Sequence, residues 1–178
     1  MSAHAILSPS SAKRWINCPP SARINAEAQQ KDTVYTREGT LAHAICELKA
    51  RKHFLTGVGP KRYQAAMDKF RADELWQDEM EGHTDTYLEA LKDIAAQYSE
   101  APHVALEVKV DFSEYVPEGF GTADCVIVGS DGHIDVMDYK HGLGVQVDAE
   151  NNPQLRLYAL GVLEVLMYIY DIVSTDPV

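Results

Sequence analysis

The sequence predicts an α/β fold of the α+β type, with helices over about residues 8–98 and a sheet core over about 103–170. Three observations support this class. Residues 104–112 alternate strictly between apolar and other side chains, as a strand with one buried face does. Two β-prone runs, 126–128 and 134–137, flank an Asp-Gly turn signal. Apolar residues in 83–98 recur at helical spacing.

The first half of the chain is expected to be mostly helical. Ser8-Pro9-Ser10-Ser11 is typical of a helix start, and Cys18-Pro19-Pro20 should end that helix, because a residue before proline disfavours the α conformation. The polar residues 25–36 are expected to form a loop. Periodicity and propensity predict three further helical stretches, which are 40–54, 61–80 and 83–98.

The last predicted helix starts at Asn152-Pro153, with asparagine as the cap and proline in the first turn. Gln154 and Tyr158 lie four residues apart and therefore share one face. The remaining positions are apolar almost all round, which predicts a buried helix. The two polar side chains must then find partners. Phosphate or an active-site water is one option, and an ordinary core hydrogen bond is the other.

The segment between Gly121 and Lys140 is expected to form a hairpin whose open end gathers charge. Residues 123–128 and 134–140 should be antiparallel neighbours across the turn. Because strand side chains repeat with period two, Asp138 and Lys140 should point to one face and Tyr139 to the other. Asp124 then falls near Asp138, so two carboxylates and one ammonium group converge.

This set of side chains suits metal-dependent phosphodiester hydrolysis. Mg²⁺ prefers oxygen ligands, commonly one or two carboxylates together with water and substrate phosphate. A bound metal polarises a phosphoryl oxygen and supplies hydroxide near neutral pH. Lys140 would orient the water or neutralise developing charge. The alternative is a solvated hairpin with Asp124, Asp138 and Lys140 as ordinary surface residues.

Two further residues are candidates on weaker grounds. His43 lies in the first turn of the helix predicted over 40–54, beside its apolar stripe, where a surface or satisfied core histidine is the ordinary reading. Glu107 is expected on the polar face of the strand 104–112, either as an acid for a second metal or outer shell, or as a solvent-facing glutamate.

Length, charge and cysteine content narrow the classes of protein to which the chain can belong. At 178 residues, the chain is expected to be a single domain with a substantial core. The net charge of −11 counts against a broadly basic nucleic-acid surface, although Lys13-Arg14 and Arg51-Lys52-His53 form local basic groups. The odd, widely spaced Cys18, Cys46 and Cys125 indicate free thiols in a reducing compartment and no zinc site. No secretory signal, spanning apolar run, phosphate loop or nucleophile elbow is recognisable.

Taken in order, the motifs resemble the PD-(D/E)XK nuclease superfamily, in its RecB-like and lambda-exonuclease-like branch. The resemblance covers about residues 5–160. More narrowly, the chain is similar to an uncharacterised family that phages and prophages encode. Six motifs carry it in order, namely Ser8-x-Ser10 with Trp15 and Cys18-Pro19, Gly39-Thr40-x-x-His43, Glu107, Gly121-x-x-Asp124, Asp138-x-Lys140, and Gln154-x-x-x-Tyr158.

The resemblance implies a role for each matching position. Asp124 and Asp138 would bind Mg²⁺ or Mn²⁺, with His43 and the Tyr139 backbone carbonyl completing the shell. Lys140 would position the attacking water. The implied fold is a restriction-endonuclease-like core with a central mixed β-sheet flanked by helices. The other implied site residues are Gln154 and Tyr158, which would orient the lysine or contact DNA, and Glu107 as a less certain metal ligand.

The resemblance also implies a function and partners. We expect a metal-dependent deoxyribonuclease, an exonuclease rather than an endonuclease, acting in phage recombination or replication in the cytoplasm of a bacterial host. Its partners would be duplex or single-stranded DNA, a phage single-strand annealing or binding protein, and further copies of itself in a homo-oligomer, with no membrane. The alternative is a non-catalytic DNA- or protein-binding module on the same fold.

Two departures from the resemblance shape these expectations. Some relatives hold an iron–sulfur cluster with one early and three late cysteines, but here only Cys18 matches, so no iron–sulfur cluster is expected. Relatives also often continue beyond the Gln-Tyr helix, which makes a short or C-terminally truncated form an expectation.

Overall fold

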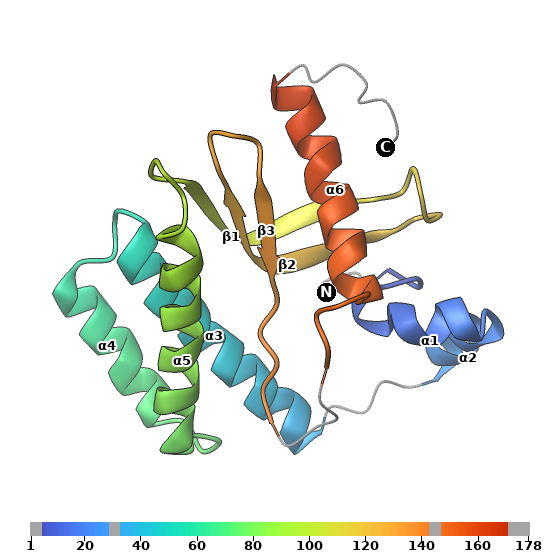
Figure 1. Ribbon diagram of the computed structural model, residues 1–178. Coiled ribbons are helices and arrows are strands. Elements are labelled where there is room, and N and C mark those ends of the chain that lie inside the picture. The colour runs from blue at the N-terminus through green and yellow to red at the C-terminus, as the bar shows by residue number, and fades with distance from the viewer. Residues whose placement is uncertain (1–4, 29–32, 143–146, 171–178) are drawn as a thin grey trace. The chain divides into compact units, whose positions relative to one another are not determined.

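Helices and strands occupy largely separate stretches of the chain, which gives the α+β class that the sequence predicts (Figure 1). The computed structural model describes residues 5–28, 33–142 and 147–170. The chain divides into two compact units. The terminal unit comprises residues 1–30, 108–123 and 147–178, and the central unit comprises 31–107 and 124–146. The prediction of a single domain is not tested by this division and stays a prediction.

The described elements follow one another in simple order. A 3₁₀ turn, η1, opens the terminal unit and the long helix α6 closes the described chain. Their bounds are η1 Pro9–Ser11, α1 Ala12–Asn17, α2 Pro20–Glu27, α3 Val34–Phe54, α4 Pro60–Arg71, α5 Glu79–Ala95, β1 His103–Asp111, β2 Phe120–Val128, β3 Ile134–Met137 and α6 Pro153–Tyr170.

The sheet has three antiparallel strands in the order β1-β2-β3. Short connections join consecutive strands, and such connections allow only antiparallel pairing. The described sheet is therefore antiparallel rather than mixed. In the β2–β3 hairpin, Cys125 pairs with Met137 and Val128 with Ile134. The predicted hairpin is confirmed, but β3 ends at Met137, before the charged segment that was expected to continue it.

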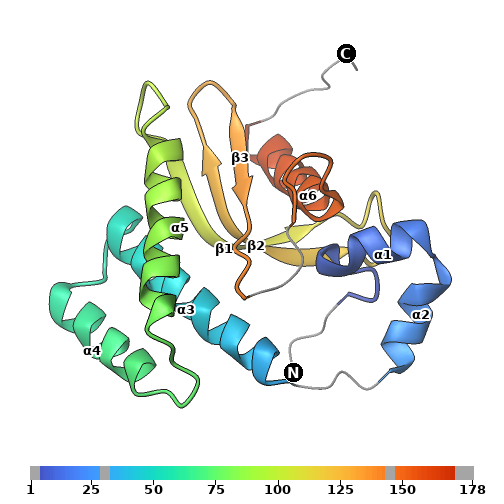
Figure 2. The ribbon, with the colours of Figure 1, turned by 60° about the horizontal axis from the view of Figure 1, so that its bottom comes forward.

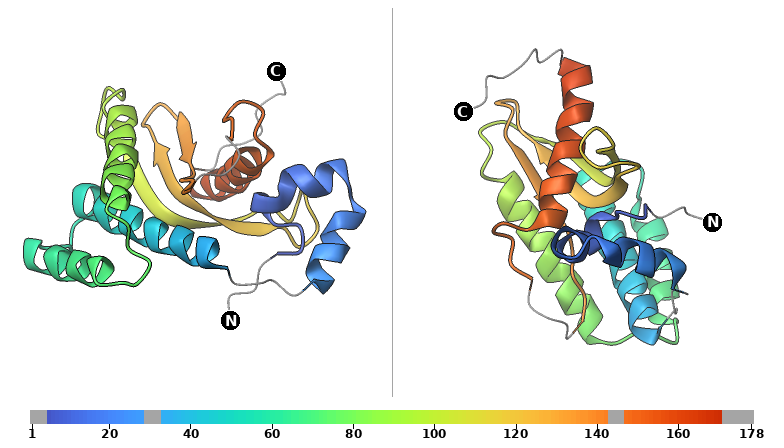
Figure 3. Two further views of the ribbon diagram at one scale, coloured as in Figure 1. Left: turned by 90° about the horizontal axis from the view of Figure 1, so that it is seen from below. Right: turned by 90° about the vertical axis from the view of Figure 1, so that its right-hand side faces the viewer.

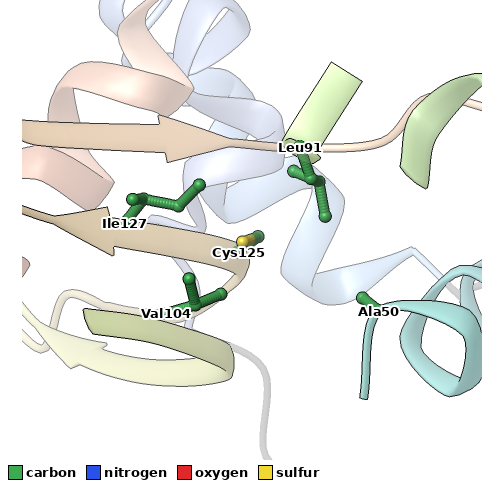
Figure 4. Packing of buried hydrophobic residues seen from close by; sticks show 5 residues of the cluster. All are labelled: Ala50, Leu91, Val104, Cys125 and Ile127. Carbon is green, nitrogen blue, oxygen red and sulfur yellow. The ribbon is translucent and has the colours of Figure 1, made fainter. Parts of the chain in front are cut away.

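Helices α3 and α5 pack on the strands of the central unit. Figure 4 shows the buried side chains that meet there, and they come from both helices and from β1 and β2. The cluster consists of Ala50, Leu91, Val104, Cys125 and Ile127. Burial of this apolar surface fixes α3 and α5 against the hairpin. Side chains that leave these elements at the open end of the hairpin are thereby held in place.

A second apolar cluster joins α3 to α4 and to the start of α5. Figure 2 shows α3 running next to both other helices. The buried members are Leu41, Ile45, Met67 and Met80. The continuous helix predicted over 61–80 is wrong, because α4 ends at Arg71 and α5 begins at Glu79. In the turn between them the Asp73 side chain accepts a hydrogen bond from the Leu75 N–H, a local bond that competes with helix.

The terminal unit is built around η1, α1 and α6 (Figure 3). The Trp15 indole donates to the Ser8 carbonyl at 3.0 Å, which closes the turn at the start of the chain. Two glycines allow close approach: a Cβ at Gly121 would lie 2.7 Å from Pro9 Cγ, and one at Gly161 would lie 2.7 Å from Val110 Cβ. Side chains larger than hydrogen would force these segments apart.

Some sequence-based boundaries are wrong. The expected loop at 25–36 is helical at both ends, because α2 extends to Glu27 and α3 begins at Val34. The Thr33 hydroxyl caps α3 by accepting from the Thr36 N–H at 3.1 Å, a signal that lies before the apolar stripe. The helix α6 is not buried on all sides, since Leu163 and Val165 are 43% and 42% exposed. None of the described helices has both the length and the apolar character needed to cross a bilayer.

Candidate functional site

The open end of the β2–β3 hairpin brings the two predicted carboxylates to one place. Extending the register by one pair beyond Cys125–Met137 sets Asp124 opposite Asp138. The Tyr139 N–H donates a 2.6 Å hydrogen bond to Asp124 Oδ2. This backbone bond ties the segment after β3 to the carboxylate on β2, so the chain itself orients Asp124.

His43 reaches the same carboxylate from α3. Its Nδ1 lies 3.3 Å from Asp124 Oδ2, and the two side chains are 35% and 15% exposed. Because α3 begins at Val34, His43 lies in the third turn of the helix and not in the first, as the sequence suggested. The Tyr139 ring meets the imidazole edge-on, with centroids 5.4 Å apart. Helix, strand and loop thus each contribute one group to this contact.

Lys140 forms an ion pair with Asp138. The Asp138 side chain is only 8% exposed, whereas that of Lys140 is 47% exposed. The lysine therefore pairs with a nearly buried carboxylate while about half of its own side chain stays exposed. The prediction that Asp138 and Lys140 face the same way is confirmed, although the two residues lie beyond the end of the strand.

The electrostatics of the site link these residues. Burial lowers the pKa of His43, but the hydrogen bond to Asp124 and the charges of Asp124 and Asp138 outweigh it, so the pKa is raised. Burial raises the pKa of Asp138, and the hydrogen bond and charge of Lys140 oppose that rise. The acids therefore favour a proton on His43, and the positive charge of Lys140 favours the ionised form of Asp138.

Glu107 belongs to the edge of the same electrostatic cluster. Its backbone has a positive φ of 53°, which is unusual for a residue other than glycine within a strand. Burial and the charges of Asp124 and Glu47 raise its pKa, while His43 and Arg51 lower it. The expectation of a polar, outward-facing residue is confirmed by its exposure. A metal-binding role for Glu107 stays a prediction.

Two charged residues of α3 were not predicted to belong to the site, although one of them, Arg51, was noted as part of a basic group. Glu47 lies one turn after His43, and Arg51 lies one turn further. Arg51 Nε donates to Glu47 Oε1 at 2.6 Å. Both residues act electrostatically on Glu107. Successive steps of four residues, from His43 to Glu47 and from Glu47 to Arg51, place all three on one helix face, a signal that was present in the sequence.

Tyr139 anchors the charged segment in the core. Its side chain is 9% exposed and packs with Ala42, Cys46 and Tyr87. Burial raises its pKa to about 12, so the phenol stays protonated. The buried Tyr139 ring thus holds in place the two charged residues on either side of it, Asp138 and Lys140.

Gln154 and Tyr158 belong to the terminal unit and form a polar pair on α6. The Gln154 side-chain amide donates to the Tyr158 hydroxyl at 3.1 Å, which confirms that the two share a face. The Gln154 N–H donates to Asn152 Oδ1 at 2.9 Å, so the asparagine caps the helix as predicted. Tyr158 is buried beside Gly121. Their contribution to catalysis stays a prediction.

The donor types at the hairpin end fit a hard divalent cation. Asp124 and Asp138 offer carboxylate oxygens, and His43 offers an imidazole nitrogen, a set that Mg²⁺ and especially Mn²⁺ accept. Across residues 5–28, 33–142 and 147–170, no group of three or more His, Cys, Asp or Glu side chains is already arranged to hold a metal ion. Instead the acids pair with His43 and with Lys140.

The fold and these side chains define an α+β protein with an acidic, lysine-containing centre at a hairpin end. Residues 4–176 match the family described as "Protein of unknown function (DUF2800)", and the chain belongs to that family. A comparison with solved structures finds no match.

Proposed function

We propose that the protein is a metal-dependent deoxyribonuclease that hydrolyses DNA phosphodiester bonds and leaves 5′-phosphates. One observation carries the proposal: Asp124, Asp138, Lys140 and His43, from three separate segments, interact at the open end of one hairpin. The same residues match the ordered motifs of the PD-(D/E)XK superfamily. We favour exonuclease action in phage recombination or replication, in the cytoplasm of a bacterial host.

The proposed hydrolysis assigns a separate role to each residue of the site. A divalent cation, when bound, would supply a polarised phosphoryl oxygen and hydroxide at neutral pH. Asp124 and Asp138 would hold it, with His43 and the Tyr139 carbonyl completing the set. The Tyr139 N–H keeps Asp124 oriented. Lys140 would orient the attacking water and offset negative charge on the phosphate, since its side chain is half-exposed beside Asp138.

Incubation of the purified protein with end-labelled linear duplex and with closed circular DNA, in Mn²⁺, Mg²⁺ or EDTA, tests the proposal. We expect metal-dependent loss of the linear substrate only, and a decrease of at least about 100-fold in Lys140→Ala. Lys92→Ala is the matched control, because Lys92 forms a lysine–carboxylate pair with Glu89 on α5. Full activity in Lys140→Ala would refute the proposal, and nicking of the circle would assign endonuclease action.

A non-catalytic binding module on the same fold is the second candidate. The net charge of −11 favours it. Calorimetric titration with Mn²⁺ distinguishes the two. An enzyme should bind Mn²⁺ through Asp124 and Asp138 and lose that binding in Asp124→Asn, whereas a degenerate module should bind weakly or not at all.

A further inference from the structure

A cavity of about 620 Å³ lies beside the proposed catalytic lysine, within the central unit. One wall is a face of α5, where Glu79, His83 and Thr86 follow one another at helical spacing. The opposite wall is the segment 139–142, directly after Asp138. Gln77, two residues before α5 begins, completes the lining. The volume lies within the range of small-molecule sites, which is about 300–1,000 Å³.

Aromatic rings and hydrogen-bonding groups face this cavity from both walls. The rings of His83 and His141 approach with centroids 6.1 Å apart and an interplanar angle of 58°. The Tyr139 hydroxyl lies 3.3 Å from His141 Nδ1, which orients that imidazole. The Thr86 hydroxyl donates to the Gly82 carbonyl and keeps its lone pairs as acceptors. The cavity therefore offers flat ring faces together with donors and acceptors.

Lys140 connects the cavity to the acidic centre. Its ammonium pairs with Asp138, and the same side chain lines the cavity. An occupant of the cavity would therefore have one end beside the group that we assign to the reacting phosphate. A larger hollow of about 700 Å³, lined by Arg37 and Glu74 among others, contains none of the candidate residues.

We propose that this cavity seats one unpaired nucleotide of the DNA strand next to the cleaved bond, with its phosphate toward Lys140 and His141 and its base on the His83 ring. The inference rests on the proposed function and extends it to the form of the substrate. Unstacked bases are bound in proteins by stacking on aromatic rings, histidine included, and by hydrogen bonds to their edges. Bases inside a duplex are paired and stacked, so the strand enters this cavity unpaired.

Binding without cleavage tests the proposal. A fluorescein-labelled, 5′-phosphorylated single-stranded tetranucleotide is titrated with the intact protein in EDTA, and fluorescence anisotropy gives the dissociation constant. We expect His83→Ala to weaken binding about tenfold. His83→Phe, which keeps a flat ring, should restore most of the affinity. A nucleoside 5′-monophosphate should displace the tetranucleotide from the wild type.

His103→Ala is the matched control, because His103 is an exposed histidine of β1 outside the cavity lining. His83 is exposed as well, so its removal leaves the core intact. Equal affinities for His83→Ala and His103→Ala would overturn the nucleotide seat. Lys140-dependent cleavage with unchanged binding by His83→Ala would overturn the seat alone. Binding that depends on His83 in a protein without nuclease activity would support the seat and refute hydrolysis.

Discussion

The two ends of the β2–β3 hairpin carry similar residues in different settings. At the turn, His133 Nε2 lies 3.6 Å from Asp135 Oδ1, and the His133 side chain is 64% exposed. At the open end, His43 lies 3.3 Å from Asp124, and Asp138 is almost buried. Each end thus has a histidine–aspartate pair and a second acid, but among the described residues only the open end adds a lysine ion pair.

The origin of the residues separates the two ends. At the turn, most polar bonds are local: Asp131 accepts from the His133 N–H, and the Gly129 N–H donates to the His133 carbonyl. Among the residues that the structure describes, only the Tyr98 hydroxyl, which donates to Asp135 at 2.6 Å, comes from elsewhere. At the open end, α3, β2 and the segment after β3 each supply a charge. A turn needs local bonds, whereas acids that gather from distant segments at low exposure are typical of functional sites.

The largest effect should come from Asp138→Asn set against Asp135→Asn. We expect the first to lower DNA hydrolysis at least about 100-fold, because it removes the carboxylate that pairs with Lys140 and that, under the proposed function, would hold the cation. The second loses a charge at the turn end and should keep activity within about threefold of the wild type. Initial rates on linear duplex in Mn²⁺ measure both. Equal losses would remove the functional distinction between the two ends.

Gly129→Ala should damage the turn end without touching the open end. A Cβ there would lie 2.4 Å from Tyr98 Cε1 and 2.5 Å from Asp131 Oδ1. We expect a loss of about 1–3 kcal/mol in the free energy of unfolding, measured in urea. The rate of DNA hydrolysis per folded molecule should not change. Gly82→Ala, which adds a methyl group in open space on α5, should instead raise stability. A Gly129→Ala variant with the same free energy of unfolding as the wild type would contradict the observed packing.

The histidines should differ in metal binding. His43→Ala is expected to weaken Mn²⁺ binding at least about tenfold, because it removes a nitrogen beside Asp124. His133→Ala should leave the affinity unchanged, since its partner Asp135 is held by Tyr98. Isothermal titration calorimetry measures both constants. Weaker binding in His133→Ala alone would move the metal site to the turn.

The smallest effect concerns pH and stability. Burial raises the pKa of the folded Asp138 carboxyl, even though Lys140 opposes the rise. The unfolded chain therefore gives up this proton first, and stability falls as the pH rises from the unfolded pKa of about 4 to the higher folded pKa. Asp138→Asn removes that cost and should stabilise the protein at neutral pH by up to about 1 kcal/mol.

Urea unfolding at a series of pH values measures this effect. Asp138→Asn should exceed the wild type in free energy of unfolding, and this difference should shrink as the pH falls toward about 4, where the carboxyl of the unfolded chain also becomes protonated. Asp93→Asn, at an exposed position on α5, is the control. A gain that is the same at all pH values would mean that packing, rather than charge, is responsible.

Local signals were sufficient for much of the fold and for the central pair of acids. The alternation of β1, the Asp-Gly turn and the Asn152 cap all act between near neighbours in the chain, so their effect does not depend on tertiary context. Antiparallel pairing across a short turn then fixes which residues are opposite, and Asp124 and Asp138 follow from counting. The early start of α3 was missed because its cap precedes the apolar stripe.

The tertiary structure alone decided which distant residues join these acids. Burial of Leu91, Ala50 and Cys125 holds α3 and α5 against the hairpin, and this packing brings His43 to Asp124 and places His83 opposite His141. Helical periodicity predicts that His43, Glu47 and Arg51 share a face, but it does not predict which residues of other elements that face contacts. The sequence by itself determined the open end of the hairpin; only long-range apolar packing determined its partners, because that packing depends on the whole core.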